Sequence, residues 1–193
     1  MIRLIGPGGA GKSAAGALLA QRLGVAFVDL DEVFTTNFVD ISSYLDAHGY
    51  DAYAERNVSV YLGLAARADR EAVLALSSGF MTYRSDIHPE YESCRRDIAS
   101  SRSTFVLLPS LELETCVAEI VCRQTIRPFA QSASREEQAI RSRFPIYVNI
   151  PARKIETMRP VREVVHEIVG YHQGARWTHG EECECSVRHQ ELG

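Results

Sequence analysis

The chain has 193 residues, of which 46% are hydrophobic and 24% charged, and its formal net charge is −4. This composition suits a single globular domain and excludes a disordered or fibrous chain. The acidic balance argues against nucleic acid as the main partner, and no apolar run approaches the roughly 20 residues that cross a bilayer.

An apolar segment begins at the second residue, which leaves no room for a signal peptide ahead of it. We therefore expect a cytoplasmic protein that binds a small molecule and neither nucleic acid nor a membrane. The aromatic content of 8%, with no spare apolar helix face, favours a monomer.

Strand-like and helix-like segments alternate along the chain. Short apolar runs predict strands at 2–5, 26–30, 72–76, 104–108 and 151–157. Helical spacing of apolar residues predicts helices at 13–23, 41–48, 52–69, 91–100, 111–122, 135–143 and 160–171. This alternation predicts a three-layer α/β/α fold with a central, mainly parallel sheet, whose ligands bind at the carboxyl ends of the strands.

We expect one domain over residues 1–172 and a tail over 173–193, since the last segment is rich in His, Glu and Gly and lacks periodicity. Cys183 and Cys185, near His179 and His189, leave a metal site open as an alternative. The C-x-C spacing differs from the C-x-x-C of zinc sites, so a tail without metal is favoured.

The motif G-P-G-G-A-G-K-S at residues 6–13 follows the first predicted strand and precedes the first predicted helix. A strand, G-x-x-x-x-G-K-S and a helix in this order form the phosphate-binding loop of P-loop NTPases. Lys12 would reach the β- and γ-phosphates, and the Ser13 hydroxyl would bind Mg²⁺. The residues that we expect to bind the nucleotide are Gly8, Gly9, Ala10, Gly11, Lys12, Ser13 and Ala14.

Asp29 and Asp31 close the second predicted strand, where alternate residues share a face. Both carboxylates would then face the phosphate-binding loop. One could hold Mg²⁺ through water, and the other could accept the proton of an attacking hydroxyl. The structural alternative is that Asp31 only caps the next segment.

Four motifs together resemble the shikimate kinase family of small-molecule kinases. They are the loop at 6–13, F-V-D-L-D at 27–31, R-P at 127–128 and R-F-P-I-Y at 143–147. The resemblance implies a helical substrate-binding segment at about 33–70 and a mobile lid at about 123–135.

The resemblance also implies a role for each matched residue. Lys12 and Ser13 would serve ATP and Mg²⁺, with Asp29 near the metal. Asp31 would contact the acceptor hydroxyl, Arg127 of the lid would close over the phosphates, and Arg143 would hold the acceptor's carboxylate. The catalytic set would be Lys12, Asp31 and Arg127, and the acceptor would contact Asp31, Gly79 and Arg143.

Two departures from the family pattern concern the acceptor. Ala54 replaces the family's substrate-binding arginine and Asn57 replaces its glutamate partner, and these positions share one helix face. The family's three glycines after the third strand are Ser77, Ser78 and Gly79 here. Glycine at such a position permits close approach of the backbone to a ligand.

Three functions follow from these residues. The first is an ATP-dependent kinase with shikimate as the leading acceptor. The second is a kinase for another polyol or sugar acid, as in gluconate kinases, because the acceptor residues differ. The third is a non-catalytic nucleotide sensor, against which the intact Lys12, Asp29 and Asp31 argue.

Overall fold

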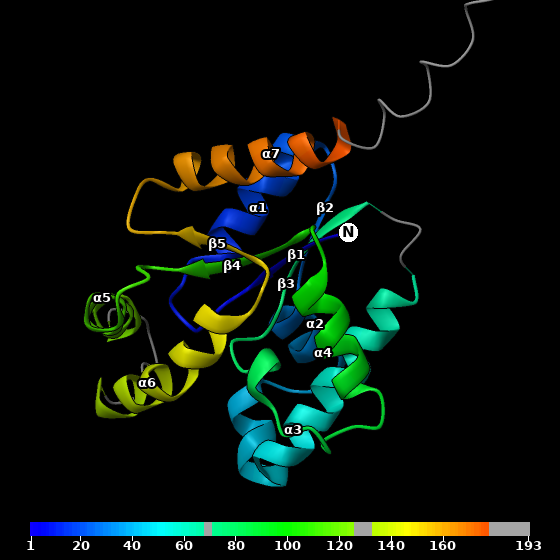
Figure 1. The fold of residues 1–193 in the computed structure, drawn as a ribbon. Helices are drawn as coiled ribbons and strands as arrows, with labels where there is room; N and C mark the ends of the chain where they lie inside the picture. Colours follow the sequence, from blue (N-terminus) through cyan, green and yellow to red (C-terminus); the bar gives the residue numbers. More distant parts are fainter. Residues whose placement is uncertain (68–70, 126–132, 178–193) are drawn as a thin grey trace, which may run out of the picture.

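The computed structural model describes residues 1–67, 71–125 and 133–177. Its strands form one sheet in the order β2-β3-β1-β4-β5 (Figure 1). All four strand pairs are parallel, which confirms the predicted sheet. The strands are β1 (Ile2–Ile5), β2 (Ala26–Asp29), β3 (Ala72–Ala75), β4 (Thr104–Leu108) and β5 (Arg153–Glu156).

Helices cover both faces of this sheet (Figure 1). They are α1 (Lys12–Leu23), α2 (Leu30–Asn37), α3 (Ile41–Ala65), α4 (Tyr91–Ser100), α5 (Leu113–Thr125), α6 (Ala133–Asn149) and α7 (Val161–Trp177), with a 3₁₀ turn, η1, at Phe80–Thr82. The three-layer α/β/α prediction is therefore confirmed.

Alternation along the strands builds a separate core on each face. On one face, Leu4 and Leu107 of the strands share a buried cluster with Leu19 of α1 and Val165 of α7. On the other face, Ile5 and its alternating neighbours in β3 and β4 share a buried cluster with residues of α2 to α6. The inner strands β3 and β4 are buried at every residue because both of their faces are covered.

Several element boundaries differ from those predicted. β2 ends at Asp29, and the unpredicted helix α2 begins at Leu30. The two helices predicted on either side of Gly49 are both present within α3, and the non-helical φ and ψ of Gly49 form the predicted break between them. α6 continues through Pro145, and α7 runs to Trp177, so the predicted domain boundary at residue 172 falls inside a helix.

Three predictions concern residues outside the described ranges. Arg127 and the middle of the proposed lid, 126–132, are among them. The Cys183 and Cys185 alternative also lies there, in 178–193. A search of the described helices finds none with the length and apolarity to cross a membrane.

Candidate active site

The loop between β1 and α1 has the backbone that anion binding requires. Gly9 and Gly11 have φ angles of 74° and 88°, and Gly11 is the N-cap of α1. Positive φ is strained for residues with a Cβ, so glycine suits both positions. Lys12 Nζ donates to the carbonyls of Gly6 (2.8 Å) and Pro7 (2.9 Å). The loop therefore wraps closely around its lysine at the positive end of the α1 dipole.

Ser13 and Asp29 meet at the start of α1. Ser13 Oγ donates to Asp29 Oδ2 at 2.6 Å. Asp29 Oδ1 accepts from the backbone N–H of Asp31 at 3.0 Å and so caps α2. A hydroxyl and a carboxylate are oxygen ligands of the kind that Mg²⁺ takes beside nucleotide phosphates. The two side chains fit that ion, which supplies charge neutralisation on the phosphates when bound.

Asp31 was predicted at a strand end, and this is wrong, because it lies in the first turn of α2. The argument that it shares a strand face with Asp29 therefore fails. The chain turns from β2 into α2 at Asp29, and the two carboxylates bind different partners: Ser13 for Asp29 and Ser77 for Asp31. The helix cap is Asp29, so the alternative that Asp31 serves as the cap is also wrong.

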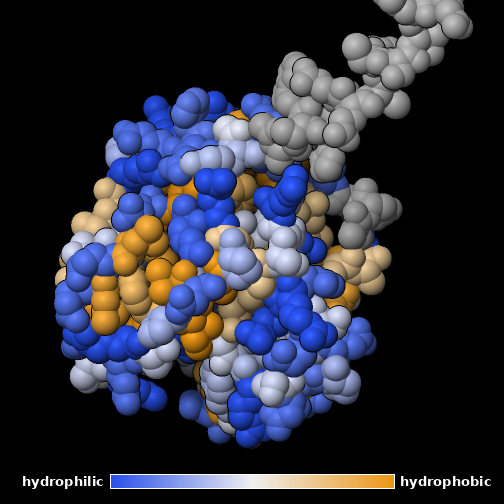
Figure 2. All heavy atoms as spheres, in the orientation of Figure 1, coloured by the Kyte–Doolittle hydropathy of each residue, from blue (hydrophilic) through white to orange (hydrophobic). Residues whose placement is uncertain are grey.

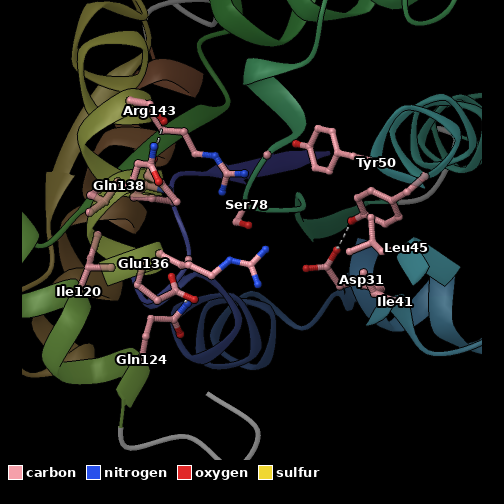
Figure 3. A pocket seen from close by; sticks show the side chains of 18 residues that line it. Asp31, Ile41, Leu45, Tyr50, Ser78, Ile120, Gln124, Glu136, Gln138 and Arg143 are labelled. Carbon is pink, nitrogen blue, oxygen red and sulfur yellow. Dashed lines mark hydrogen bonds between the residues drawn. The ribbon is translucent and has the colours of Figure 1, made fainter. Parts of the chain in front are cut away.

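A pocket of about 770 Å³ opens beside the phosphate-binding loop. Figure 2 shows the molecule hollowed between α6 and α3, where this pocket lies. Asp31 and Tyr50 lie on one side, Arg143 on the other, and Ser78 between them (Figure 3). Gly8 and Pro7 of the loop also line it. The pocket thus joins a phosphate-binding site to a carboxylate and a guanidinium.

Arg143 of α6 and Tyr50 of α3 converge on Gly79. A Cβ on Gly79 would lie 2.6 Å from the Tyr50 hydroxyl and 3.4 Å from Arg143 Nη2. Burial raises the pKa of Tyr50, and the nearby Arg143 partly opposes that rise. The neutral hydroxyl and the guanidinium therefore present donors side by side, an arrangement that suits a carboxylate.

Two hydroxyl groups donate to one oxygen of the Asp31 carboxylate. Ser77 Oγ donates to Asp31 Oδ1 at 2.5 Å, and the Tyr53 hydroxyl donates to the same oxygen at 3.3 Å. Burial, and next the charge of Asp31, raise the pKa of Tyr53, so its hydroxyl stays protonated. Asp31 is therefore held by neutral donors on the protein side.

Ala54 and Asn57, the two positions on α3 that depart from the family pattern, are both buried. Ala54 is 1% exposed within the larger core cluster, and Asn57 is 0% exposed. Asn57 contacts Ser77, which is itself a departure. The changed residues therefore form a packed, neutral wall behind Asp31.

The two described ends of the proposed lid lie in helices. Residues 123–125 are the last of α5, and residues 133–135 are the first of α6. Arg123 donates to the Gly9 carbonyl at 3.2 Å and to the Thr157 carbonyl at 3.0 Å. Arg123 thus anchors α5 to the phosphate-binding loop, a contact that the sequence analysis missed.

Sequence analysis also missed Tyr50, Tyr53 and Arg135 as pocket residues. Tyr50 and Tyr53 are three residues apart on a helix that follows the Asp31 segment, a spacing that places both on one face. That spacing was the available signal. The motif D-L-D-E at 29–32 could likewise have identified α2, because Asp at the N-cap with Glu three residues later marks a helix start.

The model of the shikimate kinase family matches residues 8–172. The chain belongs to the shikimate kinase family. Shikimate kinase of Francisella tularensis subsp. novicida is 31% identical over 172 residues, which cover 86% of this chain and 91% of the relative. Shikimate kinase of a Marinomonas species is 26% identical over 173 residues, covering 87% and 89%.

Solved shikimate kinases have the same fold. Shikimate kinase from Acinetobacter baumannii in complex with shikimate aligns with a TM-score of 0.69 and 25% identity, covering 91% of this chain and 93% of the other. The enzyme from Aquifex aeolicus aligns with a TM-score of 0.62, covering 91% and 98%, at 21% identity. As a member of the shikimate kinase family, this protein is a small-molecule kinase that uses ATP.

Proposed function

We propose that the protein transfers the γ-phosphate of ATP to a hydroxyl of shikimate, forming shikimate 3-phosphate. The observation that carries the proposal is the pocket in which Asp31 and Arg143 face each other beside the phosphate-binding loop. Family membership and the likeness to a shikimate-bound kinase support the same acceptor.

The proposed mechanism assigns a separate task to each side chain. The loop from Gly8 to Ala14 binds the phosphates, and Lys12 neutralises the transferred group. Ser13 and Asp29 would hold Mg²⁺. Asp31 accepts the proton of the acceptor hydroxyl. The hydroxyl oxygen of the acceptor forms the new bond to the γ-phosphorus, and the bond from that phosphorus to ADP breaks. We assign Arg127 to the closing of the lid over the phosphates.

Acceptor recognition is assigned to Arg143, with the Gly79 backbone beside it. A guanidinium binds a carboxylate through two parallel hydrogen bonds, which orients the acceptor as well as retaining it. With its carboxylate bound to Arg143, the acceptor would direct the hydroxyls on the far side of its ring toward Asp31, across the pocket.

ADP release tests the proposal. Purified protein with ATP and Mg²⁺ is assayed with shikimate, gluconate and a panel of other hydroxy acids and polyols. We expect turnover with shikimate, its loss in Lys12→Ala, and a strongly reduced kcat in Asp31→Asn with ATP binding nearly unchanged. Much faster turnover of another acceptor would contradict shikimate and leave the kinase mechanism in place.

A further inference from the structure

A line of buried polar side chains runs from the core to Asp31. The Tyr83 hydroxyl donates to Asn57 Oδ1 at 3.1 Å, and Asn57 Nδ2 donates to Ser77 Oγ at 3.0 Å. Ser77 Oγ in turn donates to Asp31 Oδ1 at 2.5 Å. These four residues come from three separate segments: α2, α3 and the turns after β3. We call this line the Asp31 relay.

The proton positions in the relay follow from the chemistry of its members. A carboxylate only accepts, so Ser77 must give its one hydroxyl proton to Asp31. The Ser77 oxygen can then only accept, which requires the amide nitrogen of Asn57 on that side. The Asn57 carbonyl oxygen therefore faces Tyr83, whose hydroxyl donates to it. The relay has one consistent direction, from Tyr83 toward the carboxylate.

The relay contacts only one of the two carboxylate oxygens. Among the described residues, the side-chain hydrogen bonds to the Asp31 carboxylate, from Ser77 and Tyr53, both end on Oδ1. Figure 3 shows the other oxygen turned into the pocket. A carboxylate fixed through one oxygen keeps the second aimed at a single point, which is what proton transfer from a bound hydroxyl needs.

Burial argues against a purely packing role for these residues. Asn57 is 0% exposed, Ser77 is 2% exposed and Tyr83 is 7% exposed. Buried amide and hydroxyl groups are costly unless their hydrogen bonds are made, and a set of apolar side chains would fill the same space without that requirement. These buried polar side chains are accounted for if their hydrogen bonds serve to hold the Asp31 carboxylate.

We propose that Ser77 is a positioning residue for Asp31, and that Asn57 and Tyr83 act through Ser77. The departures from the family pattern at 57 and 77 are then one coupled change, since the two side chains hydrogen-bond to each other. The proposal rests on the assigned role of Asp31 in the reaction, and goes beyond it by naming the groups that hold its carboxylate.

Steady-state kinetics provide the first test. Ser77→Ala should lower kcat about 10- to 100-fold, the effect of losing one hydrogen bond to a charged group, with the KM for ATP unchanged. Ser77→Thr, which keeps the hydroxyl, should recover most of that loss. The matched control is Thr104→Val, because the buried Thr104 hydroxyl has no hydrogen-bond partner among the described residues. A kcat of Ser77→Ala within twofold of the starting enzyme would overturn the proposal.

A double-mutant cycle tests whether Tyr83, the residue of the relay farthest from Asp31, acts on Asp31 through Ser77. Tyr83→Phe removes only the hydroxyl that orients Asn57 and should lower kcat about 3- to 10-fold. The same change in a Ser77→Ala background should have little further effect, because the route to Asp31 is already broken. Independent, multiplicative effects would show that Tyr83 does not act through Ser77.

Crystal structures of the unmodified protein and of Ser77→Ala supply a readout that needs no acceptor. We expect one orientation of the Asp31 carboxylate in the first and a rotated or divided one in the second. An unchanged carboxylate in Ser77→Ala would refute the positioning role whichever acceptor is used. Failure with shikimate alone would refute the proposed acceptor, and the kinetic tests would then use the acceptor found in the panel.

Discussion

Arg143 lies across the pocket from Asp31, on α6, where its guanidinium reaches over Gly79. If it holds the acceptor's carboxylate, Arg143→Ala should raise the KM for the acceptor about 10- to 100-fold and leave the KM for ATP nearly unchanged. Arg141→Ala is the matched control, because Arg141 is exposed on the same helix and pairs with Glu114 and Glu137. Equal effects of the two substitutions on acceptor KM would contradict the assignment.

Gly79 is a second residue on which the acceptor site depends. The Cβ of alanine there would come within 2.6 Å of the Tyr50 hydroxyl, closer than real Cβ contacts allow. Gly79→Ala should therefore displace Tyr50 and raise the acceptor KM about 10-fold or more, while ATP binding, measured by titration, stays unchanged. A weakened affinity for ATP would instead show that the change spreads to the phosphate-binding loop.

At this scale, the described residues predicted from motifs lie together in the structure, and their roles stay predictions. The glycines, Lys12 and Ser13 are local to one loop, so their pattern predicts their arrangement. Asp31 was predicted as a site residue and lines the pocket, but it lies in a helix and not in the predicted strand. Arg135 enters the pocket through the packing of α6, which no local pattern encodes, whereas the spacing of Tyr50 and Tyr53 was an available signal.

Gly49 determines the shape of the helix that forms one wall of the pocket. It lies inside α3 with φ 80° and ψ 170°, a conformation that is available to glycine and strained for other residues. Gly49→Ala should therefore lower the free energy of unfolding by about 1–3 kcal/mol. The measurement is urea unfolding followed by circular dichroism.

Gly63 provides the control for that substitution. It lies in the same helix without a positive φ, and a Cβ there would meet nothing within 4 Å. Gly63→Ala should raise the free energy of unfolding by about 0.5–1 kcal/mol, because alanine favours a helix. A loss of stability in both variants would mean that α3 is intolerant of any substitution, and that the kink is not the cause.

The elements themselves were predicted with uneven success. β1, β4 and α4 were predicted with the bounds that the structure has, since their patterns are strong and local. α2 was missed because Asp31 was placed at the end of the second strand, so the helix start at Leu30 was not recognised. α6 was ended too early because Arg143 was taken as the last helical residue, whereas the helix continues through Pro145 to Asn149.

The whole molecule should lose stability in alkaline solution. Burial, and next the charge of Asp97, raise the pKa of the Cys94 thiol from 9.0 to about 11. Because the thiol ionises at a lower pH in the unfolded chain than in the folded one, the protonated thiol stabilises the folded state below pH 9. This contribution to the free energy of unfolding is lost as the pH rises toward 11. Urea unfolding across pH 8 to 11 should show this decline, and Cys94→Ala should make it shallower.

Cys122 is the control for that experiment, because it carries the same thiol group as Cys94 but is exposed. Cys122→Ala should leave the decline with pH unchanged. If both cysteine variants give the slope of the unmodified protein, the alkaline loss arises elsewhere, and the buried tyrosines are the next candidates. Burial is the first cause of a raised pKa in Tyr53, Tyr83, Tyr91 and Tyr147.

The strand order has a consequence for synthesis on the ribosome. β1 and β2 are made first, yet neither pairs with the other, because β3 lies between them in the sheet. Their common neighbour starts at residue 72, and the remaining neighbour of β1 starts at residue 104. A nascent chain therefore carries its nucleotide loop on a strand without a partner until β3, at residues 72–75, has been made. It should gain affinity for ATP only after β4 has left the exit tunnel, and until then its apolar strands are available to chaperones.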